Sequence, residues 1–411
     1  MARPLTETPD LGRLKRRAER HGRRRALLLV APLFLFLLVA FVVPIGTMLY
    51  GAIADTEVAP VLHRTYAELA RSGDAAVPGE PVFAALAHDL RDAKRNRSVG
   101  PAAKRLNVGM SGARSLIKRT ARKLSKAEHE GPWREAFATM DPRWTQPAIW
   151  AAIRDAGGPM TALFLLEAVD RTRDAAGAVV PVDPEQAIYL NIFGRTFWIS
   201  LLVTLLALAL GYPLAYFIAS LPPRRAYFVL ILVLLPFWTS LLVRTTAWIV
   251  LLQREGVVND LALAMGLIDT PADLVFNRTG VLVAMTHILL PFMVLPLFSV
   301  MGSVPRSTIQ AARSLGATAW TTFWRVYVPQ TKAGIGAGCL LVFMLSIGYY
   351  ITPALVGGPT DQLVSYFVAL HTQQTLNWGL ASALGAILLL STLVLYWVFQ
   401  RTVGVERLQL G

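Results

Sequence analysis

The sequence predicts an all-α polytopic membrane protein with six transmembrane helices and a large outer loop after the first span. Three observations predict this fold. The chain has 411 residues, of which 54% are hydrophobic, and its mean hydropathy is +0.48; soluble domains are nearer 45–50% apolar. The apolar residues gather in long runs almost free of charge, as bilayer-spanning helices require. Lys and Arg are concentrated in alternate short loops, which is typical of cytoplasmic flanks.

The first apolar run follows a basic N-terminal segment, residues 1–25, which holds nine Lys/Arg and three acids. Residues 26–50 then carry no charge. Because the apolar core of a secretory signal is only 7–15 residues long, we interpret this run as a membrane helix. Five more runs follow, roughly at 197–221, 227–252, 279–304, 333–356 and 377–399. Gly334 and Gly338 lie four residues apart in the fifth run, a spacing that favours close helix packing.

Residues 54–190 differ in kind from the apolar runs. They contain 19 Lys/Arg and 17 Asp/Glu, and the stretch 91–126 alone has 12 Lys/Arg and one acid. We predict an extramembrane insertion that is partly helical, with short helices near 147–155 and 160–170. The formal net charge of +14 is attributed to anchoring at membrane flanks, and binding of nucleic acid is disfavoured for a chain this apolar.

The short loops predict the orientation. The basic N-terminus is expected in the cytoplasm, and six crossings return the tail, residues 401–411, to the same side. The links 222–226 and 305–332 are rich in Arg and fall inside, whereas 253–278 and 357–376 are acidic or nearly uncharged and fall outside. The insertion at 54–190 is then outside, since long loops cross a membrane largely regardless of their charge.

The link between the fourth and fifth runs carries the most informative pattern. It reads QAARSLG over residues 310–316, then nine residues, then VYVP over 326–329. Ile309, Ala312 and Leu315 can share one helical face, and Gly316 offers a break. The pattern therefore predicts a short amphipathic helix–turn–helix, whose apolar face needs either the membrane surface or a groove on a partner.

This spacing resembles the EAA motif of ABC importer permeases, which runs Glu-Ala-Ala, three residues, Gly, nine residues, then Ile-x-Leu-Pro. The residues at the matching positions are Gln310, Ala311, Ala312, Gly316 and Pro329. Gln310 departs from the family, because a Glu is usual there. In that family the loop is a cytoplasmic coupling helix that docks in a groove of the ATPase subunit, so the resemblance implies the same role here.

Other segments resemble spermidine/putrescine permeases. They are LPFWTS at 235–240, VRT at 243–245, LPFMVLPL at 290–297, GYYITPALVGG at 348–358 and NWG at 377–379. The resemblance covers about 190–400, plus the first span by position. It implies a five-helix permease core at 191–400 with its EAA-like loop at 306–332, in the bacterial inner (plasma) membrane. It also implies a polyamine-type solute, ABC ATPase subunits, a second permease subunit and an extracytoplasmic solute-binding protein.

Ionisable residues inside membrane spans are costly, so each suggests a functional site. Arg244 and His287 each lie about eight residues from the outer end of their run and are expected at similar depth. We predict that they line the translocation pathway; the alternatives are an Arg bonded to backbone carbonyls and a His bonded to a neighbouring helix. Aromatic faces that could hold a cation, or simply pack, belong to Trp238, Trp248, Tyr349 and Tyr350.

Several readings stay open beside the polyamine permease. An ABC permease for iron, an opine, thiamine or sulfate would share this architecture, and the partner permease could be identical or different. A self-contained secondary transporter or channel would need no docking loop, and no Asp or Glu lies in the six runs to serve proton coupling. A membrane enzyme or receptor working through 54–190 is the third class. No catalytic residue set, cofactor site or metal-ligand spacing is apparent: Cys339 is the single cysteine, and no GxxxxGK[ST] phosphate loop occurs, so ATP hydrolysis is expected on a partner chain.

Overall fold

The structure, a computed structural model, describes residues 28–403 apart from 56, 74, 127–131, 158–159 and 174–177. The predicted basic segment 1–25 and most of the tail 401–411 lie outside the described residues. The chain divides into two units, Met1–Gly51 and Ala52–Gly411, and each is described by itself.

The first unit is one apolar helix, Leu28–Gly51, with a mean hydropathy of 2.9. It includes a π-helical stretch, η1 (Leu38–Val42), and α2 (Val43–Gly51). Its 24 residues correspond to roughly 36 Å at 1.5 Å per residue, enough to cross a hydrocarbon core of about 30 Å. The expected first span is therefore helical, and its exposed apolar side chains call for lipid around them.

The second unit begins with a small helical domain, which we call the inserted domain (residues 52–157). Four aromatic residues in mutual contact mark its core: Phe83 meets Phe137 and Trp150 edge to face, and Trp144 packs on both Phe137 and Trp150. None of its described residues is an exposed large hydrophobic side chain, so the domain is built to face water. Its helices are α3 (His63–Ser72), α4 (Glu80–Arg95), α5 (Val99–Gly109), α6 (Ala113–Leu124), α7 (Trp133–Met140), η2 (Pro142–Thr145) and α8 (Pro147–Asp155).

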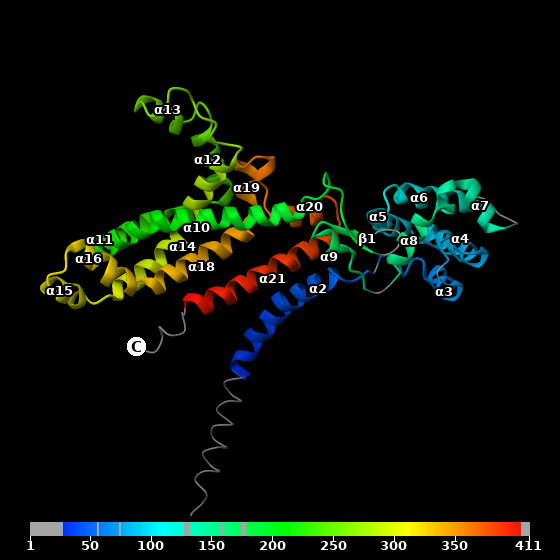
Figure 1. Ribbon diagram of the computed structural model, residues 1–411, viewed down its shortest axis with the longest axis horizontal. Coiled ribbons are helices and arrows are strands. Elements are labelled where there is room, and N and C mark those ends of the chain that lie inside the picture. The colour runs from blue at the N-terminus through cyan, green and yellow to red at the C-terminus, as the bar shows by residue number, and fades with distance from the viewer. Residues whose placement is uncertain are drawn as a thin grey trace, which may run out of the picture. The chain divides into compact units, whose positions relative to one another are not determined.

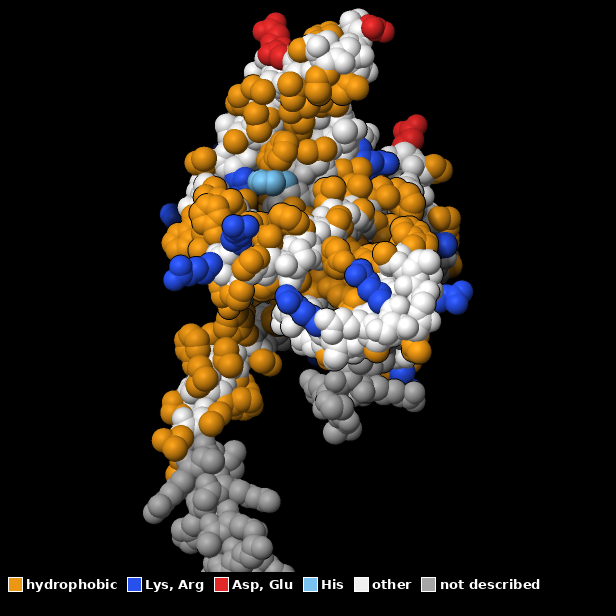
Figure 2. Space-filling model, turned by 90° about the vertical axis from the view of Figure 1, so that its left-hand side faces the viewer, with side chains coloured by type: hydrophobic (Ala, Val, Ile, Leu, Met, Phe, Trp, Pro, Cys, Tyr) orange, Lys and Arg blue, Asp and Glu red, His pale blue; other side chains and the backbone are white. Residues whose placement is uncertain are grey.

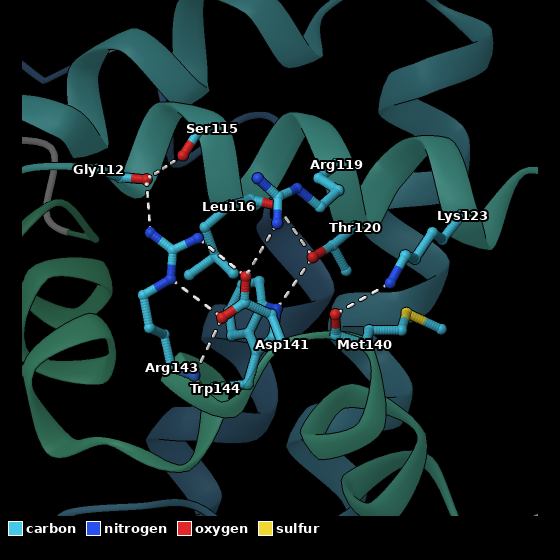
Figure 3. Close-up of polar contacts among 10 residues, drawn as sticks. All are labelled: Gly112, Ser115, Leu116, Arg119, Thr120, Lys123, Met140, Asp141, Arg143 and Trp144. Carbon is cyan, nitrogen blue, oxygen red and sulfur yellow. Dashed lines mark hydrogen bonds and ion pairs between the residues drawn. The ribbon is translucent and has the colours of Figure 1, made fainter.

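A charged node joins α6 to η2 (Figure 3). Asp141 accepts hydrogen bonds from the backbone N–H of Arg143 at 3.1 Å and from its guanidinium at 2.8 and 3.0 Å. Arg143 donates onward to the carbonyl of Gly112 at 3.2 Å, and Trp144 Nε1 donates to Thr120 Oγ1 at 2.9 Å. The hydrogen bonds and charge of Arg143 lower the pKa of Asp141 to about 2.

The two ends of the inserted domain meet each other. Ala54 and Met160 form an antiparallel bridge, and Thr161 N–H donates to the carbonyl of Ile53 at 2.6 Å. Next comes a junction of α9 (Leu163–Glu167) and a two-stranded antiparallel hairpin, β1 (Arg171–Arg173) with β2 (Val179–Pro181). The segment expected as a helix at 160–170 is thus helical only in its middle. The inserted domain leaves and rejoins the permease chain at nearly one point.

Specific contacts fasten this junction to the membrane helices. Phe164 fills the space above Gly379 of α21 (Trp378–Val403), where a Cβ would lie 2.3 Å from its ring. Arg105 of α5 stacks on Phe164 at 4.9 Å and forms a 2.6 Å ion pair with Asp55. Asp170 accepts from the backbone N–H groups of Tyr189 and Leu190, at 2.9 and 2.7 Å, and so caps the first turn of α10 (Tyr189–Ser220).

Three long helices form the centre of the membrane core: α10, α14 (Arg278–Ser303) and α18 (Lys332–Gly348), which lie side by side in Figure 1. Small residues let them approach closely. A Cβ on Gly211 would meet Met293 at 2.9 Å, and one on Gly338 would meet its sulfur at 2.7 Å. One on Gly334 would lie 3.1 Å from the carbonyl oxygen of Pro296. The close packing expected from Gly334 and Gly338 is confirmed.

Two of the apolar runs are not straight. The segments Pro223–Trp238 and Leu241–Ala264 meet at 98°, and Ala319–Gln330 meets Lys332–Gly348 at 62°. Among the described residues, four helices are long and apolar enough to span a membrane, and up to six spans result if each bent pair counts as one. The expectation of a single helix at 227–252 is wrong in shape, and the run 333–356 is divided between α18 and a separate short helix that begins at Ile351. Pro236 removes a backbone donor, Ser240 caps a new helix by accepting from Val243 N–H at 3.2 Å, and α18 ends at Gly348.

The remaining elements connect these spans. They are α11 (Pro223–Leu234), η3 (Leu235–Trp238), α12 (Leu241–Leu252), α13 (Val257–Ala264), α15 (Arg306–Ser314), α16 (Ala319–Thr322), η4 (Phe323–Tyr327), α17 (Val328–Gln330), α19 (Ile351–Val356), η5 (Pro359–Asp361) and α20 (Val364–Gln373).

Candidate functional site

The expected helix–turn–helix at 309–325 is present as α15 and α16. The turn between them is set by Gly316, whose φ of +86° only glycine adopts freely. Its N–H donates to the carbonyl of Arg313 at 2.9 Å, and the N–H of Ala317 reaches back to Ala312 at 3.1 Å. This pair of bonds is the Schellman arrangement that ends helices. Thr318 then caps α16 by accepting from Thr321 N–H at 3.2 Å.

Apolar side chains stand unburied on this hairpin. Helix α15 buries none of its residues, Leu315 is 88% exposed and Trp320 is 72% exposed. Gln310 and Ala311 are exposed beside them, and Ala312 is half-buried. We call the exposed side chains of α15 together with Leu315, Trp320 and Trp324 the α15–α16 surface. A soluble surface seldom leaves two tryptophans and a leucine in water, so this surface is made to be covered.

The charge at this end of the molecule is one-sided. Figure 2 faces the end that carries α11, α15 and α16, and Lys and Arg side chains lie scattered among hydrophobic ones there. Acidic side chains appear only toward the upper part of that view. The exposed basic residues of α11, α15 and the following η4 are Arg224, Arg225, Arg306, Arg313 and Arg325. With Gln310 in place of an acid, α15 itself carries no negative charge.

An aromatic cluster holds the hairpin to the membrane core. Phe323 packs edge to face on Tyr212 and Tyr216 of α10, with ring centres 6.1 and 5.6 Å apart. Tyr327 meets Tyr216 at 5.2 Å, and the hydroxyl of Tyr212 lies 3.0 Å from Thr331 Oγ1. Sequence reasoning missed this cluster. Its signal is the repeat of aromatic residues four apart, at 212 and 216 and again at 323 and 327, which places each pair on one helical face.

Pro329 lies in the first turn of α17, directly before the bend into α18. The helix is continuous from Ala319 to Gln330, and the π-helical stretch η4 directly precedes α17, where the proline lacks an N–H for the regular helical hydrogen bonds. The motif residues therefore fall on three parts of one continuous segment that leads from α15 to α18. Gln310, Ala311 and Ala312 lie on α15, Gly316 forms the turn, and Pro329 lies at the start of the α18 span.

The second group of predicted residues, inside the membrane core, comes together only in part. The guanidinium of Arg244 bonds to the carbonyls of Pro236 and Thr239, the latter at 2.9 Å, and to Thr239 Oγ1 at 3.3 Å. It therefore stabilises the bend between η3 and α12, as the alternative interpretation held. Its charge still acts on His287 and Tyr349, so these three groups are neighbours.

His287 is tied to α12 rather than to a free cavity. Trp248 Nε1 donates to His287 Nδ1 at 3.2 Å, with the two rings edge to face at 5.2 Å. One turn away, the hydroxyls of Thr245 and Thr352 lie 3.4 Å apart, both fully buried. Trp238 is not part of this group: it is 88% exposed on η3. Tyr350 is 37% exposed at the end of α18, so it too lies at the surface of this chain.

A shallow apolar hollow of ≈ 530 Å³ lies on α12, lined by Leu242, Val243, Thr246, Ala247, Val250 and Leu251. Its lining is almost wholly apolar, and Leu242, Val243 and Val250 are exposed. Within a membrane such a face contacts lipid or another helix.

Comparison with known proteins supports the family suggested by these features. Residues 207–403 match the family described as binding-protein-dependent transport system inner membrane component. The spermidine/putrescine transport system permease protein PotB of Escherichia coli K12 is 34% identical over 213 residues, 51% of this chain and 78% of that protein. PotB of Haemophilus influenzae is 32% identical over 248 residues, 58% of this chain and 86% of that protein.

Among solved structures, a bacterial ABC transporter that imports the acidic polysaccharide alginate has a similar chain. It is 18% identical with a TM-score of 0.45, over 54% of this chain and 79% of that chain. The E. coli PotB match, at 34% identity over 78% of that protein, establishes the family of this chain. This chain belongs to the binding-protein-dependent transport system inner membrane components: it is a non-enzymatic membrane permease subunit of an ABC importer, which works with an ATPase, a second permease subunit and a solute-binding protein.

Proposed function

We propose that this permease imports polyamines of the spermidine/putrescine type, and that its α15–α16 surface is where an ATPase subunit docks. The docking role rests on one observation above all: a hairpin fixed by the Gly316 turn displays Leu315 and Trp320 unburied. The substrate class rests on the PotB relatives, which match most of their own length.

The contacts of the hairpin suggest how ATP binding on the partner would move the transport helices. Phe323 and Tyr327 clasp α10, while α17 continues from the hairpin toward α18. A displacement of the α15–α16 surface therefore pushes on both helices, whose contacts with α14 pass through Gly211 and Gly338. Packed interfaces of this kind shift between discrete arrangements rather than deform continuously.

The proposed orientation follows from the same hairpin. If the ATPase docks on it, the α15–α16 surface is cytoplasmic, which agrees with its excess of Arg. An even number of crossings then places the N-terminus and the C-terminal tail inside and the inserted domain outside.

Selection of a cationic solute is expected to rest mainly with the binding protein. Asp and Glu are absent from the described residues of α10, α12, α14, α18 and α21, and Arg244 adds positive charge near His287 and Tyr349. The permease interior offers aromatic faces instead, with Trp248 and Tyr349 beside the Arg244 bend.

The test of docking compares two glycines with the same backbone. Gly316 and Gly266 both have positive φ, +86° and +66°, and at both a Cβ would meet open space. Asp adopts the left-handed region more readily than most residues, so both Asp variants are expected to insert and fold. We expect the ATPase to co-purify with wild type and Gly266→Asp from solubilised membranes and to be lost from Gly316→Asp. Retention of the ATPase by Gly316→Asp would contradict the docking role.

The substrate is tested separately, in proteoliposomes that contain the full importer and its binding protein. ATP-dependent uptake of labelled spermidine, competed by putrescine but not by sulfate or ferric iron, is the expected result. Uptake of sulfate or iron without spermidine would assign the permease to another solute and leave the docking role intact.

A further inference from the structure

Helix α6 of the inserted domain carries a row of basic side chains that make no ion pair with the described residues. Arg114, Lys118 and Arg122 are exposed and follow one another at four-residue spacing, so they form one ridge, which we call the α6 ridge. The opposite side of α6 is fully packed: Leu116, Ile117 and Leu124 are 0–3% exposed. The ridge is therefore held rigidly, with its orientation fixed by the domain core.

Two other basic residues on the same helix, Arg119 and Lys123, have a structural role. Arg119 faces Asp141 at 3.7 Å, and Lys123 Nζ donates to the carbonyl of Met140 at 3.0 Å (Figure 3). Those two residues tie α6 to α7 and η2. The α6 ridge makes no ion pair or side-chain hydrogen bond of this kind with the part of the chain that the structure describes.

On α3 and α4, several surface charges are paired. Arg71 pairs with Glu68 on α3 at 2.5 Å, and Asp92 of α4 pairs with both Arg64 and Arg95, at 2.8 and 2.6 Å. Like charges four residues apart destabilise a helix, and α6 contains no acid that would offset this cost for the α6 ridge. The sequence 93–126 contains no acid at all. Solubility alone would be served equally well by mixed charges.

We propose that the α6 ridge is a docking surface for an acidic face of the solute-binding protein. This inference rests on the proposed function, because it takes the inserted domain to lie on the side from which the binding protein delivers the solute. The domain is suited to that role because Phe164 and Asp170, at its junction, fasten it to α21 and α10. A rigid basic ridge attracts an acidic partner over distance, raises the rate of encounter and fixes its orientation.

The chemistry of the domain favours a protein over a bilayer. Helices that lie on membranes insert an apolar face among the headgroups, whereas the apolar face of α6 is already buried in the core of the inserted domain. No large hydrophobic side chain is exposed among the described residues 52–157. A partner that meets this surface must do so through charge and hydrogen bonds alone.

The experiment uses the purified importer, permease with its ATPase subunits in nanodiscs, and the binding protein supplied with solute. The ridge variant is Lys118→Glu with Arg122→Glu. The matched control, Lys94→Glu with Arg134→Glu, reverses the same number of exposed charges on α4 and α7. We expect the ridge variant to slow association by about tenfold or more at low salt and to flatten its salt dependence, since steered association exceeds the neutral rate by such factors. The control should behave as wild type.

Three outcomes would overturn the proposal. Equal association rates and salt dependence for ridge variant, control and wild type would show that the ridge does not dock. Equal losses in ridge variant and control would reduce the effect to net charge. Loss of binding to anionic phosphatidylglycerol vesicles, with binding-protein association unchanged, would assign the ridge to lipid. Co-purification of the ATPase, measured on the same samples, reports on the proposed function separately, because its failure would occur in wild type as well.

Discussion

At the scale of single residues, Gly316 and Gly379 each occupy a position that disfavours a larger side chain, for different physical reasons. Gly316 is required by its backbone: nothing would touch a Cβ there, but the positive φ is costly for other residues. Gly379 has ordinary backbone and is required by space, because Phe164 occupies the place of its Cβ. The NWG segment at 377–379, noted in the sequence only as a resemblance, thus marks where the inserted domain is fastened to the last membrane helix.

The contact at Gly379 gives a stability prediction. Gly379→Ala should displace Phe164 and lower the thermal unfolding midpoint of the detergent-purified protein, since overpacking costs about 1–3 kcal/mol. Gly194→Ala is the matched control in α10, because a Cβ there meets nothing within 4 Å. Adding Phe164→Ala to Gly379→Ala should cost less than Phe164→Ala costs alone, since the new methyl then fills space that the ring has left. Full additivity of the two changes would argue against the contact.

The Asp141 node predicts how the inserted domain responds to acid. The pKa of the Asp141 carboxyl is about 2, against 3.8 for the free side chain. Ionised Asp141 therefore stabilises the folded domain above about pH 4. That contribution disappears as the pH falls through about 2. Asp141→Asn should therefore destabilise the protein by about 1–2 kcal/mol at pH 7, and the difference from wild type should shrink below pH 4.

Thermal unfolding of the purified protein at a series of pH values measures this dependence. The control is Asp269→Asn, which removes one exposed carboxylate from the loop after α13. A wild-type advantage over Asp141→Asn that persisted unchanged to pH 2 would mean that the node contributes through shape rather than charge.

At the scale of elements, η4, which follows the α15–α16 hairpin, is held against α10 by aromatic rings. The long apolar run at 279–304 could be predicted within one residue at each end, and the run at 377–399 within one residue at its start and four at its end, because a bilayer imposes both length and composition. The bends could not be predicted, since a hydropathy average carries no direction and the break depends on a local cap at Ser240. The contact between Tyr216 and Phe323 could not be predicted either, because the two residues are 107 positions apart in sequence and only the fold brings them together.

The aromatic contacts of Phe323 with α10 predict a variant that keeps ATPase docking but weakens the coupling of ATP hydrolysis to transport. Phe323→Ala should leave ATPase co-purification unchanged but reduce uptake per ATP hydrolysed, because each lost aromatic contact removes about 0.5–1.5 kcal/mol from the link to α10. Phe228→Ala, which removes an exposed ring from α11, is the control. Both variants are assayed in proteoliposomes for solute taken up and phosphate released. Normal coupling in Phe323→Ala would show that force passes through α17 alone.

At the scale of the whole molecule, the chain combines a permease core with a domain that the family match does not include. The match covers 207–403, and the inserted domain has its own core of aromatic residues, complete without any membrane helix. Sequence reasoning recognised the insertion from its charge and expected it to be partly helical, but could not place most of its helices. Its short amphipathic helices carry weaker periodic signals than membrane spans do, and its fold depends on distant contacts such as Asp55 with Arg105. The intramembrane residues were the least predictable, because Arg244 turned out to serve the bend.

The bridge between Ala54 and Met160 gives the inserted domain the character of a cassette. Since the chain departs and returns at neighbouring points, the segment between Ala54 and Met160 can be exchanged for a short linker without moving either of these two residues. Gain or loss of such a cassette leaves the transport machinery connected in the same order. A permease gene could thereby acquire a new recognition module in one step while its solute pathway continued to evolve independently.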